Sequence, residues 1–195
     1  MKYSIALTGG IATGKSTVSK IYETHGWEII DADKIAHTLL DEHSGDIANI
    51  FGKRFIKDNK VDRYKLGVFI FGDLAQRILL ENFIHPKIRD RIYYMASVLD
   101  KKKKLYLIDL PLFFETSAYD ISRSILVYAP KTTQLNRLLY RDALSREQAS
   151  ARIDAQMDIE EKREKAKYII DNTGDFKDLE KECQRVEDLI KENEK

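Results

Sequence analysis

One stretch of the sequence has residue types and spacing that fit phosphate chemistry at every fixed position. Residues 9–16 read Gly-Gly-Ile-Ala-Thr-Gly-Lys-Ser and match the pattern G-x-x-x-x-G-K-[ST] between an apolar run and a helical segment. Glycines let successive backbone N–H groups face a phosphate, and a helix N-terminus adds a favourable dipole. In this pattern Lys15 reaches the β- and γ-phosphates and Ser16 ligates Mg²⁺. We therefore predict that the phosphates of a bound nucleotide contact Gly9, Gly10, Ile11, Ala12, Thr13, Gly14, Lys15, Ser16 and Thr17.

Two carboxylates follow the second apolar run of the chain. Asp31 and Asp33 come directly after residues 28–30, separated by one alanine. A carboxylate at this edge of a sheet suits a base that orients or deprotonates an acceptor hydroxyl. Asp33 also fits the N-cap of the following helix. From the residues alone, both interpretations stay open.

Three further charged residues are candidates for phosphate or metal chemistry. Asp109 ends the apolar run 105–108, where a carboxylate holds an Mg²⁺-bound water in many nucleotide sites; the alternative is a solvated strand end. Arg137 and Arg141 lie four residues apart and so share one face of a helix. Two guanidinium groups there fit a clamp on the transferring phosphates, and the alternative is a solvated basic surface.

The elements that must position these residues are short buried strands. Apolar runs occupy residues 4–7, 28–30, 105–108, 125–128 and 168–170, with charged helical stretches between them. Such runs are typical of parallel strands covered on both faces. Ligands of parallel sheets bind beyond the carboxyl ends of the strands. The pattern predicts an α/β fold with a five-stranded parallel sheet.

The uneven spacing of these runs predicts two insertions. Residues 36–99 carry helical patterns at 35–40, 64–83 and 88–99 and turn signals at Ser44-Gly45 and Phe51-Gly52, so we expect a helical insert. Residues 134–165 are dense in charge and predict one or two exposed helices. The tail from residue 177 to 195 predicts a closing amphipathic helix. Its apolar positions are Leu179, Cys183, Val186 and Ile190.

Composition excludes several classes of protein. The 195 residues carry 33 Lys and Arg against 32 Asp and Glu, a net charge of +1, which argues against binding built on bulk charge. The lysine run 101–104 has no interleaved aromatics, so we predict a solvated loop and no nucleic-acid partner. Cys183 is the single cysteine and has no internal disulfide partner. The longest uncharged stretch, residues 3–14, is shorter than the ~20 residues of a membrane span. We expect a cytoplasmic protein without a membrane partner.

Several segments resemble the dephospho-CoA kinase family over nearly the whole chain. The loop with Leu7-Thr8 before it and Ile30-Asp31-Ala32-Asp33 after it resembles the N-terminus of that family. Further similar segments follow in order: His-Pro-Lys-Ile at 85–88, Leu-Pro-Leu-Phe-Phe-Glu at 110–115, Arg137 with Arg-Asp at 141–142, Ala-Gln at 155–156 and Ile-Asp-Asn at 170–172. This resemblance implies that ATP phosphorylates the ribose 3′-hydroxyl of dephospho-CoA, giving CoA and ADP in the last step of coenzyme A biosynthesis.

The same resemblance implies an architecture and a set of roles. It implies a P-loop kinase with a nucleotide-binding core (1–35, 100–133 and 166–195), a helical CoA-binding insert (36–99) and a helical lid (134–165). Catalysis is expected from Asp33, Lys15 and Arg141, with further ATP contacts from Arg137 and Asn172 and with Mg²⁺ on Ser16 and Asp109. Substrate contacts are expected from Thr8, Asp33, His85, Arg89 and Leu112.

The local structure at Pro86, Asn172 and Ala12-Thr13 follows less directly from the sequence. Pro86 suits the first position of a helix, so we expect a helix to start at His85-Pro86. Asn172 either borders the adenine ring or is a turn residue after the last strand. The family usually has Gly-Ser where this chain has Ala12-Thr13, and a methyl group at position 12 disfavours a positive φ. ATP and dephospho-CoA are the expected partners, for a monomer or small homo-oligomer.

Three other functions would account for parts of the sequence. Another kinase with the same loop, such as a nucleoside monophosphate kinase, would share the core and the lid. A GTP-binding switch would explain Asn-Lys-Val-Asp at 59–62 and the Asp-x-x-Gly match at 171–174, but their order along the chain is reversed, so we interpret both as chance. A scaffold with a degenerate ATP site is disfavoured by the intact Lys15 and Ser16.

Overall fold

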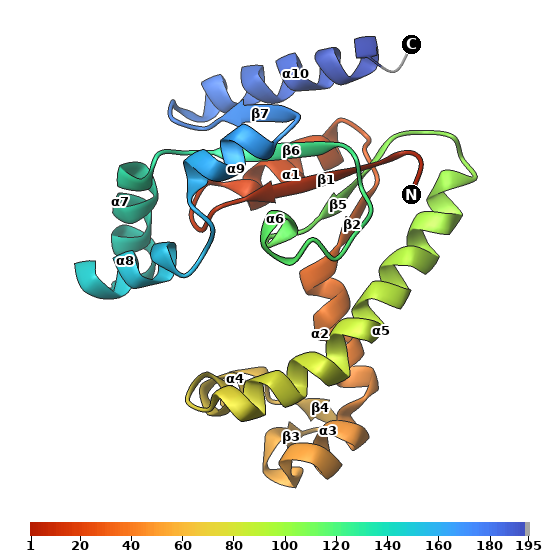
Figure 1. The fold of residues 1–195 in the computed structure, drawn as a ribbon, viewed down its shortest axis with the longest axis vertical. Helices are drawn as coiled ribbons and strands as arrows, with labels where there is room; N and C mark the ends of the chain where they lie inside the picture. The colour runs from red at the N-terminus through yellow and green to blue at the C-terminus, as the bar shows by residue number, and fades with distance from the viewer. Residues whose placement is uncertain (194–195) are drawn as a thin grey trace. The chain divides into compact units, whose positions relative to one another are not determined.

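A computed structural model of the chain describes residues 1–193, so Glu194 and Lys195, the last two positions of the predicted tail helix, lie outside the described residues. The strands are β1 (Ser4–Gly9), β2 (Ile29–Asp31), β3 (Ile56–Lys57), β4 (Lys60–Val61), β5 (Tyr106–Asp109), β6 (Ser124–Tyr128) and β7 (Tyr168–Asp171) (Figure 1). The helices are α1 (Lys15–Thr24), α2 (Ala32–Glu42), α3 (Ser44–Phe51), the 3-10 turn η1 (Lys53–Phe55), α4 (Arg63–Phe71), α5 (Leu74–Asp100), α6 (Phe113–Thr116), α7 (Lys131–Asp142), α8 (Arg146–Asp154), α9 (Ile159–Lys165) and α10 (Phe176–Asn193).

The chain divides into two compact units. The first contains residues 1–30 and the chain from Leu99 onward, and the second contains Asp31–Val98. The first unit holds a five-stranded parallel sheet in the order β2-β5-β1-β6-β7, with β1 paired to β5 and β6. All five predicted apolar runs are strands of this sheet. The predicted α/β fold class is therefore confirmed.

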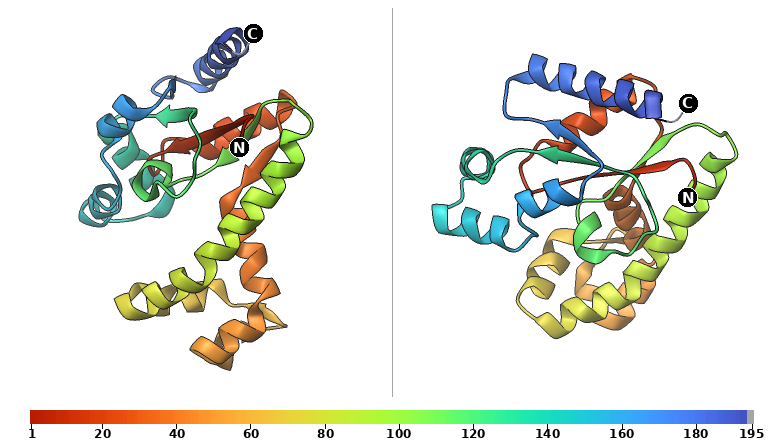
Figure 2. Two further views of the ribbon diagram at one scale, coloured as in Figure 1. Left: turned by 45° about the vertical axis from the view of Figure 1, so that its right-hand side comes forward. Right: turned by 45° about the horizontal axis from the view of Figure 1, so that its top comes forward.

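Helices cover both faces of the sheet. Ile125 and Val127 of β6 pack in a core with α1 and α10, while Leu126 and Tyr128, which alternate with them, pack against Ile159 of α9. Figures 1 and 2 show α1 and α10 side by side on one face. Because alternate residues of a strand point to opposite faces, burial on both sides explains the unbroken apolar runs in the sequence.

The helices after β6 confirm one prediction and correct another. In α10, Leu179, Cys183, Val186 and Ile190 are all buried, so the predicted amphipathic helix is confirmed within the described residues. The segment predicted to hold one or two helices instead contains most of α7 and all of α8 and α9. Within residues 1–193 no helix has both the length and the apolar character needed to cross a membrane.

The second unit has its own core and a hairpin that the sequence reading missed. Its helices bury Ile47, Phe51 and Leu66 around the β3–β4 hairpin. Asp58 and Asn59 form the two-residue turn with φ of 49° and 60°, the left-handed geometry that short hairpins favour. The remaining members of this core are Phe55, Val61 and Leu80.

The hairpin also explains one of the misleading motifs. The Asn-Lys-Val-Asp match begins at Asn59 in the hairpin turn and ends at Asp62, whose carboxylate accepts the Lys65 N–H as the N-cap of α4. The predicted turn at Ser44-Gly45 was wrong, because Ser44 begins α3. The predicted turn at Phe51-Gly52 is confirmed, since Gly52 ends α3 with φ of 107°.

Pro86 does not begin a helix. The chain was expected to start a helix at His85-Pro86, but Pro86 lies inside α5, which runs unbroken from Leu74 to Asp100. A proline removes one backbone hydrogen bond and bends a helix, and Figure 1 shows α5 as a bent helix. Residues on both sides of the proline are buried, including Ile84 and Ile92, so packing of both halves holds the helix together.

Candidate active site

The loop between β1 and α1 has the backbone geometry of a phosphate cradle. Gly14 has φ of 94°, and a Cβ atom there would lie 2.2 Å from Asn172 Nδ2. Ala12 has φ of 60°, a left-handed conformation that costs an L-residue about 1–2 kcal/mol. The loop therefore needs glycine at position 14 and keeps alanine under strain at position 12.

The loop leaves several backbone donors open. Thr13 donates both its N–H and its Oγ1 hydroxyl to the Gly10 carbonyl, at 3.3 and 2.8 Å, which curls the loop. Within residues 1–193 no acceptor pairs with the N–H groups of Ala12, Gly14, Lys15 and Ser16. Consecutive free N–H groups at the start of a helix form an anion-binding concavity.

Lys15 and Asp109 meet inside the first unit. The Lys15 ammonium forms an ion pair with Asp109 Oδ1, and Asp109 is only 6% exposed. The alternative in which Asp109 is a solvated strand end is therefore wrong. Because β5 pairs with β1 in parallel register, the ends of both strands bring the carboxylate beside the loop.

Arg137 and Asn172 both hold the backbone of the loop. Asn172 is buried and donates its Nδ2 to the Thr13 carbonyl at 2.7 Å. Arg137, from α7, donates to the Asn172 carbonyl at 2.9 Å and to the Ala12 and Thr13 carbonyls at 3.4 Å. The Asn172 side chain thus bonds across to the loop, and the turn after β7 is made by Asp171, whose carboxylate accepts the Thr173 N–H.

The Arg141 side chain points to Asp142 and not to the phosphate loop. Its guanidinium makes two hydrogen bonds to Asp142, at 2.6 and 2.9 Å, and this pair is exposed to solvent. The hydrogen bond to the guanidinium lowers the pKa of Asp142 below its usual range. Arg137 and Arg141 lie on the same helix, but of the two only Arg137 contacts the loop in the described structure.

Asp33 lies in the first turn of α2 and is exposed. The N-cap of α2 is Asp31, whose carboxylate accepts the Lys34 N–H at 2.9 Å, so the alternative that made Asp33 the cap was wrong. Within the described part of the chain no hydrogen bond or ion pair engages the Asp33 carboxylate. Asp33 is therefore available to accept a proton or a hydrogen bond from a ligand.

The remaining predicted substrate residues lie in both units. Thr8 is buried in β1 and donates its hydroxyl to the Pro111 carbonyl at 3.2 Å, and Leu112, half-exposed, precedes α6. His85 and Arg89 are exposed and lie four residues apart on α5, so they share one face of that helix in the second unit.

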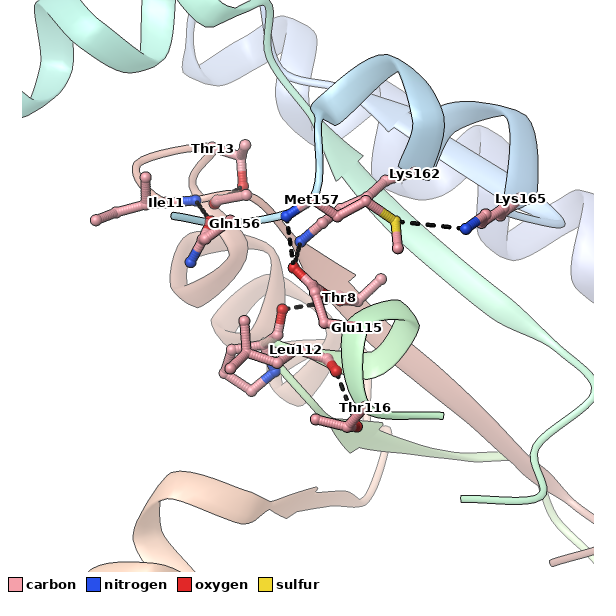
Figure 3. A network of polar contacts seen from close by, with 12 residues as sticks. Thr8, Ile11, Thr13, Leu112, Glu115, Thr116, Gln156, Met157, Lys162 and Lys165 are labelled. Atoms are coloured by element: carbon pink, nitrogen blue, oxygen red, sulfur yellow. Dashed lines mark hydrogen bonds and ion pairs between the residues drawn. The ribbon is translucent and has the colours of Figure 1, made fainter. Parts of the chain in front are cut away.

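A polar network beside the loop contains residues for which the sequence predicts no role. Gln156 Oε1 accepts the Ile11 N–H at 2.7 Å, and Lys162, which is fully buried, forms an ion pair with Glu115 at 2.6 Å (Figure 3). Gln156 and Glu115 belong to segments that resemble the family, and that is the signal that could have drawn attention to them. The signal for Lys162 is weaker, because a lysine in a charged helix usually lies at the surface.

The donor set fits a magnesium ion. Ser16 offers a hydroxyl at the second position of α1, and Asp109 offers a carboxylate at the end of β5. Both are hard oxygen ligands, and Mg²⁺ in nucleotide sites commonly takes one or two protein oxygens with phosphates and water. Among residues 1–193 no cluster of three or more His, Cys, Asp or Glu residues is placed to hold a metal ion.

Comparison with known proteins identifies the family. The family model described as dephospho-CoA kinase matches residues 3–178. A dephospho-CoA kinase of Sulfurimonas denitrificans is 48% identical over 190 residues, covering 97% of this chain and 95% of the relative. One from Helicobacter pylori strain J99 is 46% identical over 188 residues, covering 95% and 96%.

Solved structures agree with this assignment. The structure of a dephospho-CoA kinase from Campylobacter jejuni has a TM-score of 0.81 and 41% identity, covering 99% of both chains. A shikimate kinase from Acinetobacter baumannii has a TM-score of 0.50 at 19% identity, covering 98% of this chain and 94% of that one, which is a likeness of fold alone. On the match to the family model and the identity to these relatives, the chain belongs to the dephospho-CoA kinase family.

Proposed function

We propose that this chain transfers the γ-phosphoryl group of ATP to the ribose 3′-hydroxyl of dephospho-CoA, giving CoA and ADP as the last step of coenzyme A biosynthesis. The observation that carries the proposal is the family match over residues 3–178, which includes an intact phosphate loop with open N–H donors.

The loop is proposed to bind the triphosphate. Its free N–H groups face the β- and γ-phosphates, and Lys15 exchanges its contact with Asp109 for the phosphate oxygens. A Mg²⁺ ion held by Ser16 and Asp109 would neutralise phosphate charge and orient the triphosphate when bound. Arg137 and Asn172 hold the loop backbone and so fix the direction of those donors.

Asp33 is proposed to orient the acceptor. Its exposed carboxylate is unengaged within the described residues, so it can accept the hydrogen of the ribose hydroxyl and aim the oxygen at the γ-phosphorus. Thr8, Leu112, His85 and Arg89 are proposed to contact dephospho-CoA, the last two from residues 36–99 acting as the CoA-binding insert.

Residues 134–165 are proposed to act as a lid that excludes water during transfer. Arg141 would leave Asp142 and bind the phosphates when the lid closes. An exposed ion pair of this kind contributes only about 0–1 kcal/mol, so breaking it costs little. We further propose a cytoplasmic enzyme that is a monomer or a small homo-oligomer.

A coupled assay of ADP release tests this function. With ATP and Mg²⁺, we expect ADP release with dephospho-CoA and a background rate with AMP, CMP or no acceptor. Preferred turnover of AMP or CMP would favour the nucleoside monophosphate kinase alternative. ATP binding without turnover of any acceptor would favour a non-catalytic protein. Omission of Mg²⁺ should abolish release.

A further inference from the structure

One N–H group of the phosphate loop is already engaged by a side chain. The Ile11 N–H donates to Gln156 Oε1 at 2.7 Å, whereas the N–H groups of Ala12, Gly14 and Lys15 have no acceptor within residues 1–193. Gln156 lies 145 residues further along the chain, between α8 and α9 (Figure 3). The proposed mechanism does not use this contact, so it needs an explanation of its own.

The segment that carries Gln156 is anchored by a buried charge pair. The next residue, Met157, donates its N–H to Glu115 Oε1 at 3.3 Å, and the Lys162 ammonium lies 2.6 Å from the same oxygen. Figure 3 shows both nitrogen atoms converging on that oxygen. Lys162 is completely buried. Water therefore cannot take the place of Lys162 at the Glu115 carboxylate unless α9 moves.

Glu115, the acidic member of this pair, is connected to the phosphate loop through α6 and β5. Glu115 lies in α6, which follows β5, and the last residue of β5 is Asp109, the partner of Lys15. Thr8, just before the loop, also bonds to Pro111 in the connection between β5 and α6. The two ends of this stretch therefore contact Lys15, through Asp109, and the Gln156 segment, through Glu115.

We propose that Gln156 is a positioning residue for the phosphate loop. Its amide oxygen holds the Ile11 N–H, and this fixes the curl that keeps the following N–H groups open to the triphosphate. The Glu115–Lys162 pair holds Gln156 in place. This inference rests on the proposed function only in that the loop binds ATP.

The chemistry of glutamine suits this position. An amide oxygen accepts the N–H without placing a negative charge beside a site for phosphates. A glutamate would keep the acceptor, and a leucine of similar size would remove it. A pocket lined by Gly10, Gln134, Gln156 and Met157 adjoins the contact, so a changed side chain has room to fit without unfolding the chain.

The test compares Gln156→Leu, Gln156→Glu and the matched control Gln184→Ala. Gln184 is an exposed glutamine on α10 whose side chain bonds, among residues 1–193, only to its helix neighbour Asp188. In Gln156→Leu we expect the Kd for ATP with Mg²⁺ to rise about tenfold, the usual effect of one lost hydrogen bond. We expect kcat at saturating ATP to change less than about threefold, and the Ile11 amide to exchange its hydrogen faster. Gln156→Glu should retain Ile11 protection, and Gln184→Ala should match the parent in every measurement.

Three results would overturn the inference. One is unchanged exchange of the Ile11 amide in Gln156→Leu, and another is faster exchange with an ATP Kd within twofold of the parent. Loss of Ile11 protection in Gln156→Glu, in a chain that unfolds at the parent's temperature, would also exclude the acceptor role. The ATP Kd and the Ile11 amide exchange are measured without dephospho-CoA, so an error about the acceptor substrate would leave them intact. The ADP-release assay, which also supplies kcat, would reveal that error separately.

Discussion

Ala12 carries backbone strain in the middle of the phosphate loop. With φ of 60° its methyl group costs about 1–2 kcal/mol relative to glycine, and replacing it increases the entropy of the unfolded chain by the equivalent of about 0.4–1 kcal/mol. We expect Ala12→Gly to raise the free energy of unfolding by about 0.5–1 kcal/mol, measured by urea denaturation. Ala151→Gly, in the exposed interior of α8, should lower it by about 1 kcal/mol. A decrease in Ala12→Gly would contradict the strained geometry.

In the proposed mechanism Asp33 contributes to phosphoryl transfer and not to ATP binding. Asp33→Asn keeps the size of the side chain but removes its basicity, so we expect phosphoryl transfer to fall ~10²-fold or more with the Kd for ATP nearly unchanged. Asp46→Asn is the matched control, because Asp46 lies in the first turn of α3 as Asp33 lies in that of α2. Equal single-turnover rates for parent and Asp33→Asn would remove Asp33 from this role.

At the scale of single residues, the sequence indicates a site where its residues are neighbours along the chain. The phosphate loop was found because its glycines, Lys15 and Ser16 are fixed in spacing by the backbone curl itself. The contacts of Thr13 with Asn172 and of Ile11 with Gln156 join residues 159 and 145 positions apart. No local pattern predicts such pairs, because they depend on how the helices after β6 pack on the sheet.

At the scale of elements, the Glu115–Lys162 pair joins α6 to α9. Lys162→Met leaves the Glu115 carboxylate without its cation, and Glu115→Gln leaves a buried ammonium without its anion. Each change should lower the free energy of unfolding by about 3–5 kcal/mol, and the double variant should recover much of that loss.

The exposed Lys165 of the same helix supplies the control for this cycle. Lys165→Met should change the free energy of unfolding by less than about 0.5 kcal/mol. Urea denaturation measures all four variants. Additive effects of the two single changes would contradict the coupling of Glu115 with Lys162.

Glu187 makes the contact between α10 and α1 sensitive to pH. Burial alone would raise the pKa of Glu187, but hydrogen bonds from Lys191, His25 and Trp27 outweigh burial and lower the pKa below the usual range of a glutamate. The folded state therefore binds this proton less readily than the unfolded state. The stability contributed by Glu187 is fully present above the unfolded pKa and is lost as pH falls through the folded pKa.

We expect Glu187→Gln to lower the free energy of unfolding by about 1–3 kcal/mol near pH 7. The difference from the parent should shrink as pH falls below about 4.5, the ordinary range of a glutamate. Urea denaturation between pH 3 and pH 7 measures it, with the exposed Glu180→Gln on the same helix as control. A difference that stays constant over this range would show that the Glu187 charge contributes nothing.

The unbroken helix α5 and the β3–β4 hairpin, neither of which was predicted, share a physical cause. Pro86 is read as a helix start because it lacks an N–H, yet buried residues on both sides hold α5 continuous. The β3–β4 hairpin is only two residues long on each side, too short to show alternation. Tertiary packing decides both cases, and its effect is absent from local propensity.

At the scale of the whole molecule, the α/β class could be predicted because five buried strands need apolar runs of the right length. The order β2-β5-β1-β6-β7 could not, because it depends on which crossover packs on which face. The division at Asp31 and Val98 lies close to the ends of the predicted insert, where the pattern of apolar runs is interrupted. The roles of the insert and the lid remain predictions.

The most direct measurement follows the phosphoryl group itself. The chain is incubated with ATP labelled at the γ-phosphate, Mg²⁺ and dephospho-CoA, and the labelled product is located by mass and phosphorus NMR. We predict that the label appears on the ribose 3′-oxygen of CoA, with ADP formed in equal amount. Label recovered only as inorganic phosphate, or on another acceptor position, would contradict the proposed reaction.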